Sequence, residues 1–170
     1  MLLERSYFSS PAIILAPDLL GKILCRRTEN GVIRARITET ECYYGEEDTA
    51  CHAHKGKTER TQTMYEEGGI TYVYLCYGMH AMLNIVTGPK DHPEAVLIRS
   101  VEGVKGPGRA TKHLKITTND NASVLTPESG IWIEDDGLKF AYTALPRVGI
   151  DYASETDRNR PWRYIIKERE

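Results

Sequence analysis

Two glutamates in one predicted strand, Glu39 and Glu41, are the strongest candidates for chemistry in this sequence. If the segment from Val32 to Tyr43 is extended, alternate side chains share a face, and one face carries Ile33, Ala35, Ile37, Glu39, Glu41 and Tyr43. An apolar row is therefore expected to run into two acids. A buried carboxylate without a partner is costly and tends to shift its pKa, which makes it a candidate general base.

Tyrosine dominates the aromatic residues, with ten tyrosines against two phenylalanines and two tryptophans. Alternation places Tyr72 and Tyr74 on one face of a predicted strand. This strand leads into a turn that presents Tyr77 and Met79, where polar residues would be expected. An aromatic ring and a thioether at a turn favour a wedge that enters a nucleic-acid duplex. The alternative is that Tyr77 folds back onto its own sheet.

An aromatic slot around Glu41 can be formed by Tyr43, His52 and Tyr74. Stacking on such side chains contributes about 1–3 kcal/mol per base and tolerates many bases, because every base has a π-face. We therefore expect a pocket for a purine. The alternative for His52 is a loop histidine that bonds to the backbone. For Glu39 we prefer a structural ion pair with an arginine to a catalytic role.

A zinc site can also be drawn from Cys42, Cys51, His52 and His54. Their spacing does not match the usual paired-ligand patterns, and the H-x-E and P-C-x-x-C pattern of zinc deaminases is missing. The four cysteines form no C-x-x-C pair and lie in or beside apolar runs, which is typical of reduced thiols. We expect neither a metal nor another cofactor.

Length and charge limit the possible partners. The 170 residues are enough for one domain with a proper core, so we expect a single domain over residues 1–170. With 22 basic and 24 acidic residues the net charge is −2, which excludes a general attraction to nucleic acid and leaves only a local basic face. No apolar run approaches membrane-spanning length, and the first residues show no secretory or transit pattern.

The elements that must position these residues are mostly strands. A short helix is expected to start at Ala16-Pro17-Asp18, a second one to span Thr58–Glu66, and a third to run from Pro107 to Leu114. The strongest hairpin signal lies either side of residues 77–80. Further strands are expected at 22–26, 95–101 and 162–166, with a second hairpin pairing 131–134 with 138–143. The predicted class is α+β, with a mainly antiparallel sheet.

These motifs together resemble one family, the alkyladenine-type 3-methyladenine DNA glycosylases. The matching strings cover nearly the whole chain in family order: LLGKIL, ITETECYYGEEDTACHA, GKTER, YVYLCYGMHAMLNIV, AVLIRSVEG, GPGRATKHLKI, LPRVGI and RPWRYI. The resemblance implies a compact single domain whose curved antiparallel sheet carries short flanking helices and a protruding hairpin. Cys42 departs from the family, in which alanine is common, and the loop after Asn84 belongs to this sequence alone.

The resemblance also implies roles for particular residues. Glu41 matches the general base that activates the attacking water. The base-pocket residues of the family match Tyr43, His52, Tyr74 and Asn84. The intercalating pair matches Tyr77 and Met79. Arg99 matches a residue near the phosphate of the flipped nucleotide, and we group it with Lys105, Arg109 and Lys112 as expected contacts to the DNA backbone.

The expected activity is therefore base excision repair. The chain is expected to flip alkylated or deaminated purines out of duplex DNA and hydrolyse the N-glycosidic bond. No lysine lies inside the motifs as an amine nucleophile, so an abasic site without strand cleavage is expected. We expect a monomer without membrane contact, cytoplasmic and associated with the nucleoid in a bacterium or nuclear in a eukaryote. The alternatives are a catalytically silent nucleic-acid-binding module and a zinc hydrolase or deaminase.

Overall fold

The computed structural model describes residues 1–168 and, over them, one sheet of nine antiparallel strands with three α-helices. The helices are α1 (Ala12–Asp18), α2 (Pro107–His113) and α3 (Glu155–Asn159). The strands are β1 (Ile23–Thr28), β2 (Gly31–Tyr44), β3 (Thr71–Cys76), β4 (His80–Val86), β5 (Glu94–Val101), β6 (Val104–Lys105), β7 (Ile131–Glu134), β8 (Tyr142–Leu145) and β9 (Arg163–Ile166). Short 3-10 helices span Arg5–Ser9, His52–Lys55, Gln62–Tyr65, Thr118–Asp120 and Pro127–Ser129. The predicted α+β class is confirmed.

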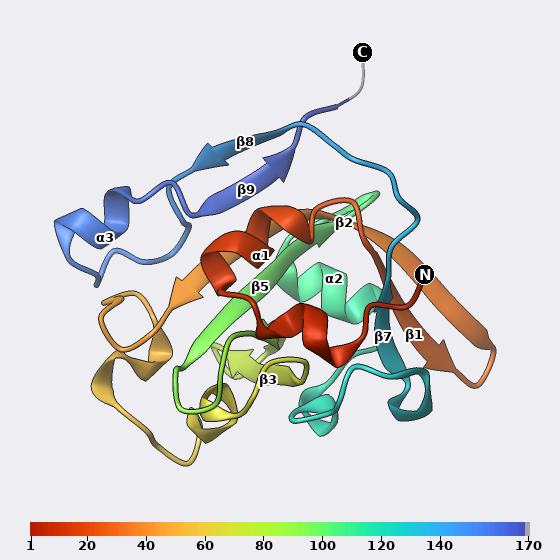
Figure 1. The fold of residues 1–170 in the computed structure, drawn as a ribbon, viewed down its shortest axis with the longest axis horizontal. Helices are drawn as coiled ribbons and strands as arrows, with labels where there is room; N and C mark the ends of the chain where they lie inside the picture. Colours follow the sequence, from red (N-terminus) through yellow and green to blue (C-terminus); the bar gives the residue numbers. More distant parts are fainter. Residues whose placement is uncertain (169–170) are drawn as a thin grey trace.

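The long strand β2 organises the sheet, whose order is β3-β4-β5-β2-β1-β7 (Figure 1). The first half of β2 pairs with β1, while its second half pairs with β5 on one side and with β9 on the other. β8 extends the sheet beyond β9. The part of β2 that carries both glutamates is therefore flanked by strands on both sides, which fixes its backbone.

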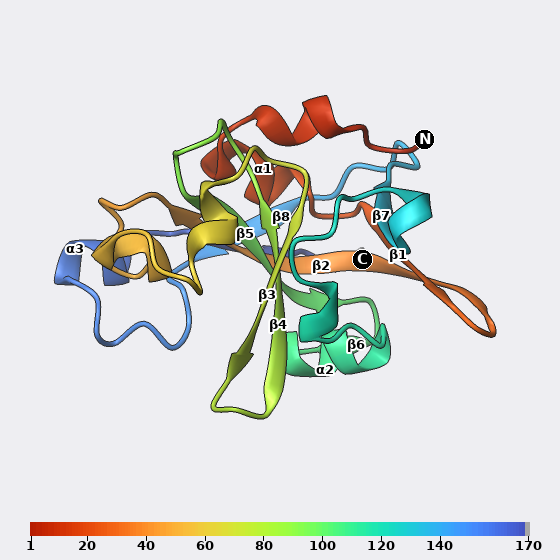
Figure 2. The ribbon, with the colours of Figure 1, turned by 90° about the horizontal axis from the view of Figure 1, so that it is seen from below.

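The predicted hairpin around residues 77–80 is confirmed. β3 and β4 pair from Thr71↔Ile85 to Cys76↔His80, and their tip extends away from the body of the molecule (Figure 2). The helix expected from Pro107 is also present as α2, which packs against β4 and β5. Pro107 suits the first turn of a helix because its missing N–H would have no helical partner there.

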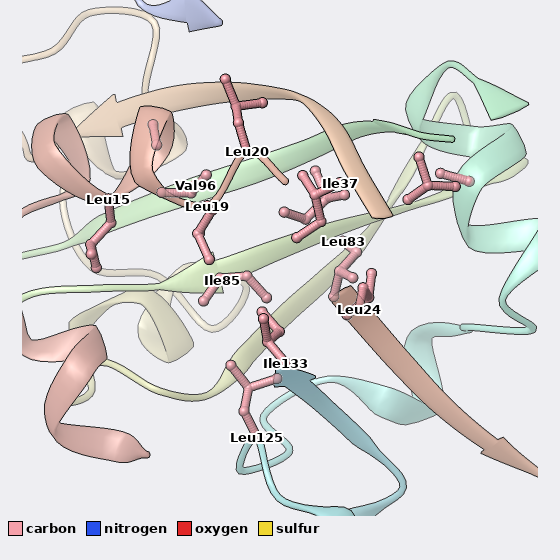
Figure 3. Packing of buried hydrophobic residues seen from close by; sticks show 14 of the residues in the cluster. Leu15, Leu19, Leu20, Leu24, Ile37, Leu83, Ile85, Val96, Leu125 and Ile133 are labelled. Atoms are coloured by element: carbon pink, nitrogen blue, oxygen red, sulfur yellow. The ribbon is translucent and has the colours of Figure 1, made fainter. Parts of the chain in front are cut away.

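The hydrophobic core lies between the helices and the central strands. Leu15 in α1 and Leu19 after it pack with Ile37 of β2 and with Leu83 and Ile85 of β4 (Figure 3). These side chains are almost fully buried. Truncating one of them to alanine typically costs about 2–5 kcal/mol, since a cavity is left behind. This core supports one side of the strands that carry the candidate site on the other.

The prediction that the two glutamates of β2 share a face with the apolar residues before them is wrong. Ala35 and Ile37 belong to the core as expected, and Ile33 packs against it. Cys42 also belongs to the core, whereas Glu41 lines a cavity outside it. The pairing of β2 with β5 is irregular between Ile37 and Thr40, so the alternation changes phase there. Bulges of this kind redirect side chains and are frequent beside active sites. The acids consequently lie on the face opposite to the apolar row.

The helix expected to start at Ala16-Pro17-Asp18 instead ends there. α1 begins at Ala12, and Pro17 lies in its last turn. The start is fixed by a distant residue, because the buried carboxylate of Glu94 accepts the backbone N–H of Ala12 at 2.6 Å. An acid at a helix start satisfies one of the unpaired N–H groups. The local sequence around Pro17 does not carry this contact.

The helix predicted for Thr58–Glu66 is wrong in type and length. Only Gln62–Tyr65 is helical, and it is a 3-10 turn. The side chains of Thr58 and Thr61 accept hydrogen bonds from each other's backbone N–H groups. Local bonds of this kind compete with helix formation and are a known reason why threonine favours turns. Met64 and Tyr65 still reach the interior.

The second predicted hairpin is also wrong. β7 pairs with β1 rather than with residues 138–143, and Tyr142–Leu145 forms β8, which pairs with β9. A turn is present at the expected place, since Asp135 accepts the N–H of Gly137. This turn leads from β7 toward β8, and the two strands do not pair with each other. The apolar residues of β7 are buried, and β1 supplies the neighbour that they need.

Candidate active site

A cavity of about 560 Å³ brings most of the predicted site residues together. Seven of them line it: Glu41, Tyr43, His52, Tyr74, Tyr77, Asn84 and Arg99. The other lining residues were not predicted: Arg60, Met64, Tyr72, Leu75, Cys76, Met82, Leu97, Pro107, Val148, Gly149, Ile150 and Tyr152. The walls come from β2, β3, β4 and β5 and from a loop about one hundred residues after Glu41.

Glu41 is fully buried and held by two donors. The phenol of Tyr43 donates to Oε1 at 2.9 Å, and the backbone N–H of Val148 donates to Oε2 at 2.7 Å. The guanidinium of Arg99 lies 3.7 Å from Oε1. Burial raises the pKa of Glu41 above its ordinary value, and Arg99, Val148 and Tyr43 oppose that rise. The result is a fixed carboxylate that takes up a proton more readily than an exposed glutamate does.

Glu39 forms the ion pair with arginine that was predicted for it. Its Oε2 accepts a hydrogen bond from Arg163 at 3.1 Å and lies 3.4 Å from Nε of Arg99, while its Oε1 accepts the hydroxyl of Ser100 at 2.8 Å. Both arginines are largely shielded from solvent. Glu39 thus contacts the same arginine that approaches Glu41.

Aromatic rings of His52, Tyr72 and Tyr74 form another part of the cavity lining. The centroids of His52 and Tyr74 are 4.5 Å apart, and those of Tyr72 and Tyr74 are 5.4 Å apart. Tyr72 was missed as a site residue, although it shares the predicted face of Tyr74. Burial lowers the pKa of His52 to about 4, with a smaller contribution from Arg60. The imidazole is therefore neutral at pH 7, and Nδ1 lies 3.2 Å from the Tyr72 hydroxyl.

Asn84 lines the cavity and is fixed by a hydrogen bond. It pairs with Tyr72 across the β3–β4 ribbon, and its side-chain N–H donates to the carbonyl of Tyr72 at 3.2 Å. The residue is almost completely buried. A buried amide held in this way presents its remaining polar groups in one orientation.

The hairpin tip is exposed, so Tyr77 does not fold back onto its sheet. Tyr77 is 92% exposed and Met79 is 75% exposed. Tyr77 adopts a left-handed backbone conformation with φ of 52°, followed by Gly78 at 66°. Such conformations are uncommon outside glycine and form the tight turn that presents the ring at the end of the ribbon. Figure 2 shows the tip between β3 and β4 projecting away from the rest of the molecule.

A buried ion pair anchors the loop that supports Glu41. Both side-chain nitrogens at the end of Arg147 donate to Asp48, at 2.6 and 3.0 Å, and Nη1 also donates to the carbonyl of Cys42. The guanidinium lies 5.0 Å from the centroid of the Tyr43 ring. Arg147 directly precedes Val148, whose N–H binds Glu41. The sequence string LPRVGI contains both residues, but it gave no indication of these contacts.

The predicted backbone contacts lie outside the cavity, with the exception of Arg99. Lys105 and Arg109 are exposed and line a second cavity of about 840 Å³, next to Glu39. Lys112 is exposed on α2 and lines a groove together with Met79 at the hairpin tip. Lys105, Arg109 and Lys112 are absent from the lining of the Glu41 cavity.

Three features are absent from the described residues, 1–168. Within this range no group of three or more histidine, cysteine or acidic side chains is placed to hold a metal ion. No helix in the described part of the chain is long and apolar enough to cross a membrane. No lysine is among the residues that line the cavity of Glu41.

Comparisons with known proteins give a consistent result. The family model described as "Methylpurine-DNA glycosylase (MPG)" matches residues 6–170. A protein of Psychrobacter cryohalolentis is 42% identical over 95% of this chain and 90% of its own length, and one of Borrelia garinii subsp. bavariensis is 41% identical over 98% and 96%. A protein of Methanocella arvoryzae is 38% identical over 97% and 92%. All three are named "Putative 3-methyladenine DNA glycosylase".

The family model and the full-length relatives confirm the resemblance found in the sequence motifs. The chain therefore belongs to the methylpurine-DNA glycosylase family and is a DNA-repair hydrolase of N-glycosyl bonds.

Proposed function

We propose that this glycosylase flips alkylated or deaminated purines out of duplex DNA and hydrolyses their glycosidic bond with a water activated by Glu41. The observation that carries the proposal is the position of Glu41, a buried carboxylate held at the wall of an aromatic cavity beside an exposed tyrosine tip. A base inside a duplex cannot reach this carboxylate. Extrusion of the nucleotide costs a few kcal/mol, and least where damage has already weakened pairing.

Glu41 has the geometry expected of a general base. A carboxylate offers about four acceptor positions, and Tyr43 and Val148 occupy two of them. The remaining positions can accept a proton from water while the water oxygen attacks the anomeric carbon and the base leaves with the bonding electrons. General-base assistance of this kind typically contributes about 10²–10⁴-fold. The negative charge also stabilises cationic character on the sugar.

The aromatic wall suits a damaged purine. Tyr43 and Tyr74 provide ring faces for stacking, and Tyr72 extends that surface. Because His52 is neutral at pH 7, it does not repel an alkylated purine that carries a positive charge. We assign Asn84 to the exclusion of normal guanine, in keeping with the family resemblance, since its amide is fixed by the Tyr72 carbonyl.

Tyr77 and Met79 are proposed to fill the space that the flipped nucleotide leaves in the stack. Their exposure supports this role, because a tyrosine that served only the core would be covered. Lys105, Arg109 and Lys112 are proposed to bind DNA phosphates on the two sides of the tip, and Arg99 to reach the phosphate of the flipped nucleotide. Phosphate contacts fix the position of the protein and carry no sequence information.

The proposed product is an abasic site in an unbroken strand. Strand cleavage by a Schiff base requires an amine nucleophile, and the cavity that holds Glu41 is lined by no lysine of the described residues. We propose that the protein acts as a monomer, in the nucleoid of a bacterium or the nucleus of a eukaryote, where its substrate is found.

The test uses duplex oligonucleotides that carry 3-methyladenine, 7-methylguanine, hypoxanthine or ethenoadenine. Excision is followed by alkali treatment and a denaturing gel, and a borohydride reaction checks for a covalent adduct. The parent protein is expected to yield alkali-dependent cleavage, and Glu41→Gln to bind lesion DNA with little excision. Single-turnover excision by Glu41→Gln at the parental rate would remove Glu41 from this role. Binding without excision by the parent would indicate a silent binding module, and a borohydride-trapped adduct would contradict the monofunctional mechanism.

A further inference from the structure

Glu39 lies where two neighbouring strands lose their regular pairing. In β2 the register shifts on both sides of Glu39, and the partner residues in β5 are Ser100 and Ile98, which leaves Arg99 between them without a paired residue. The irregularity brings the side chains of Glu39, Arg99 and Ser100 together on the face that carries Glu41. A purely structural ion pair between β2 and β9 would not need an arginine that also approaches the acid of the active site.

Arg99 is shared between two carboxylates and held tightly by neither. Its Nε lies 3.4 Å from Oε2 of Glu39, its Nη1 lies 3.7 Å from Oε1 of Glu41, and neither contact meets hydrogen-bond geometry. Nε is buried and has no hydrogen-bond partner among the described residues. A guanidinium with unused donors between two acids moves toward whichever carboxylate attracts it more strongly.

Glu39 in turn is held from its other side. Arg163 and the Ser100 hydroxyl bind its two oxygens, and they keep the carboxylate at the distance from which it attracts Arg99. Arg163 comes from β9 and Ser100 from β5, so two strands fix the position of Glu39. A series of charged contacts therefore connects Arg163 on β9 with Glu39, Glu39 with Arg99, and Arg99 with Glu41.

We propose that Glu39 is a positioning residue for the glycosylase reaction: it holds the Arg99 guanidinium away from Glu41 and leaves an unoccupied acceptor position on that carboxylate to take a proton from water. The inference rests on the proposed function of Glu41. A direct ion pair would occupy the free acceptor positions of Glu41 and stabilise its charged form, which makes it a weaker base. Glu39 prevents this by offering Arg99 a second carboxylate.

The other groups that face Glu41 do not change the direction in which Glu39 affects the basicity of Glu41. Tyr43 on β2 and the Val148 N–H donate to it, and Arg147 and Tyr152 contribute at longer range. None of these four groups contacts Glu39 in the described structure. The cations that face Glu39 are Arg99 and Arg163. Loss of the Glu39 charge therefore acts on Glu41 mainly through Arg99.

The experiment compares the pH dependence of single-turnover excision in the parent, Glu39→Gln and Glu39→Asp. Glutamine keeps the shape and removes the charge, so Arg99 is expected to pair with Glu41. The acid limb should move to lower pH by about one unit, and the plateau rate should fall about tenfold or more. The shorter aspartate should shift the limb in the same direction by less, which keeps the test possible if Glu39→Gln does not fold.

Two controls separate positioning from a simple change of charge. Glu102→Gln removes an exposed carboxylate that lies 3.9 Å from Arg36 and contacts neither Arg99 nor Glu41, so its acid limb should match the parent. Glu39→Gln is also made in an Arg99→Gln background, where it should cause no further shift. Carboxyl ¹³C titration of Glu41, assigned by comparison with Glu41→Gln, gives the same information where a variant is inactive.

Each outcome bears on the inference. A folded Glu39→Gln protein with a parental acid limb and rate would overturn it, as would a shift that persists without Arg99, since Glu39 would then act on Glu41 directly. A shift present only when Arg99 is present supports it. Failure of the proposed function is recognised separately, because the parent protein itself would then show no excision on any of the four lesions.

Discussion

Tyr43→Phe tests how the protein sets the basicity of Glu41. The substitution removes one hydroxyl, which donates to Oε1 of Glu41 at 2.9 Å, and keeps the ring that lies over the Arg147 guanidinium. Burial holds the pKa of Tyr43 well above 10, so the phenol is protonated and acts as a donor throughout the working pH range. The variant therefore removes a hydrogen bond from an ionised acid with little change in packing.

The size of the expected shift in the acid limb follows from the negative charge of Glu41, which accepts the hydrogen bond. A hydrogen bond to a charged group is worth about 1.5–3 kcal/mol, and one pKa unit corresponds to about 1.4 kcal/mol. The bond favours the ionised form of Glu41, so its loss should raise the pKa of Glu41 further, in the direction in which burial already raises it. The acid limb of excision should move to higher pH by about 1–2 units, with recovery of the rate at alkaline pH.

The assay is single-turnover excision between pH 5 and 9. The lesion is a neutral one, hypoxanthine or ethenoadenine, so that the base does not itself titrate as an alkylated cation. Tyr74→Phe is the matched control, because the Tyr74 hydroxyl donates to no carboxylate of the described residues, and its acid limb should coincide with that of the parent. An acid limb in Tyr43→Phe at the parental pH would refute the reasoning that the Tyr43 hydroxyl favours the ionised form of Glu41.

Three further outcomes are expected. Tyr77→Ala should leave the free energy of unfolding within about 0.5 kcal/mol of the parent, since the ring is 92% exposed, and should abolish the 2-aminopurine signal of base flipping; an equal signal in both proteins would count against the wedge. Asp48→Asn should lower the free energy of unfolding in urea by about 3–5 kcal/mol, because it leaves Arg147 charged and buried; a loss below about 1 kcal/mol would contradict a buried pair. The His52 imidazole should titrate in NMR with a pKa of about 4 instead of 6.5, so its share of stability is present above pH 6.5 and is lost as the pH falls toward 4; a titration near 6.5 would show that the ring is solvated.

The sequence was most informative where local pattern and burial agree. In β3 and β4 the alternation of side chains predicts which residues share a face, and Tyr72 and Tyr74 do lie on one wall of the cavity. The tip was recognised because Tyr77 and Met79 are costly to leave exposed at a turn, and they are exposed. The helix after Gly106 was predicted from Pro107 for an equally local reason.

Patterns failed where a distant residue decides the local structure. α1 begins at Ala12 because Glu94, eighty-two residues later, accepts its N–H. β7 lies beside β1, more than one hundred residues earlier in the chain, and not beside the next run of β-prone residues. The proline in α1 and the turn after β7 were both correctly recognised. However, the residue that accepts the backbone N–H of α1 and the strand that covers the apolar residues of β7 are far away in sequence.

The irregularity in β2 shows how a correct residue can be found by an incomplete argument. Strict alternation put Glu41 on the same face as Ile37, yet the shift of register around Glu39 puts it on the other face, where the cavity lies. On the core face an ionised Glu41 would have had no donors. On the cavity face it receives the Val148 N–H, the Tyr43 hydroxyl and the nearby charge of Arg99. A buried acid can serve as a base only where donors of this kind hold it in place beside a cavity, and the change of phase in β2 gives Glu41 both the donors and a position in the cavity lining.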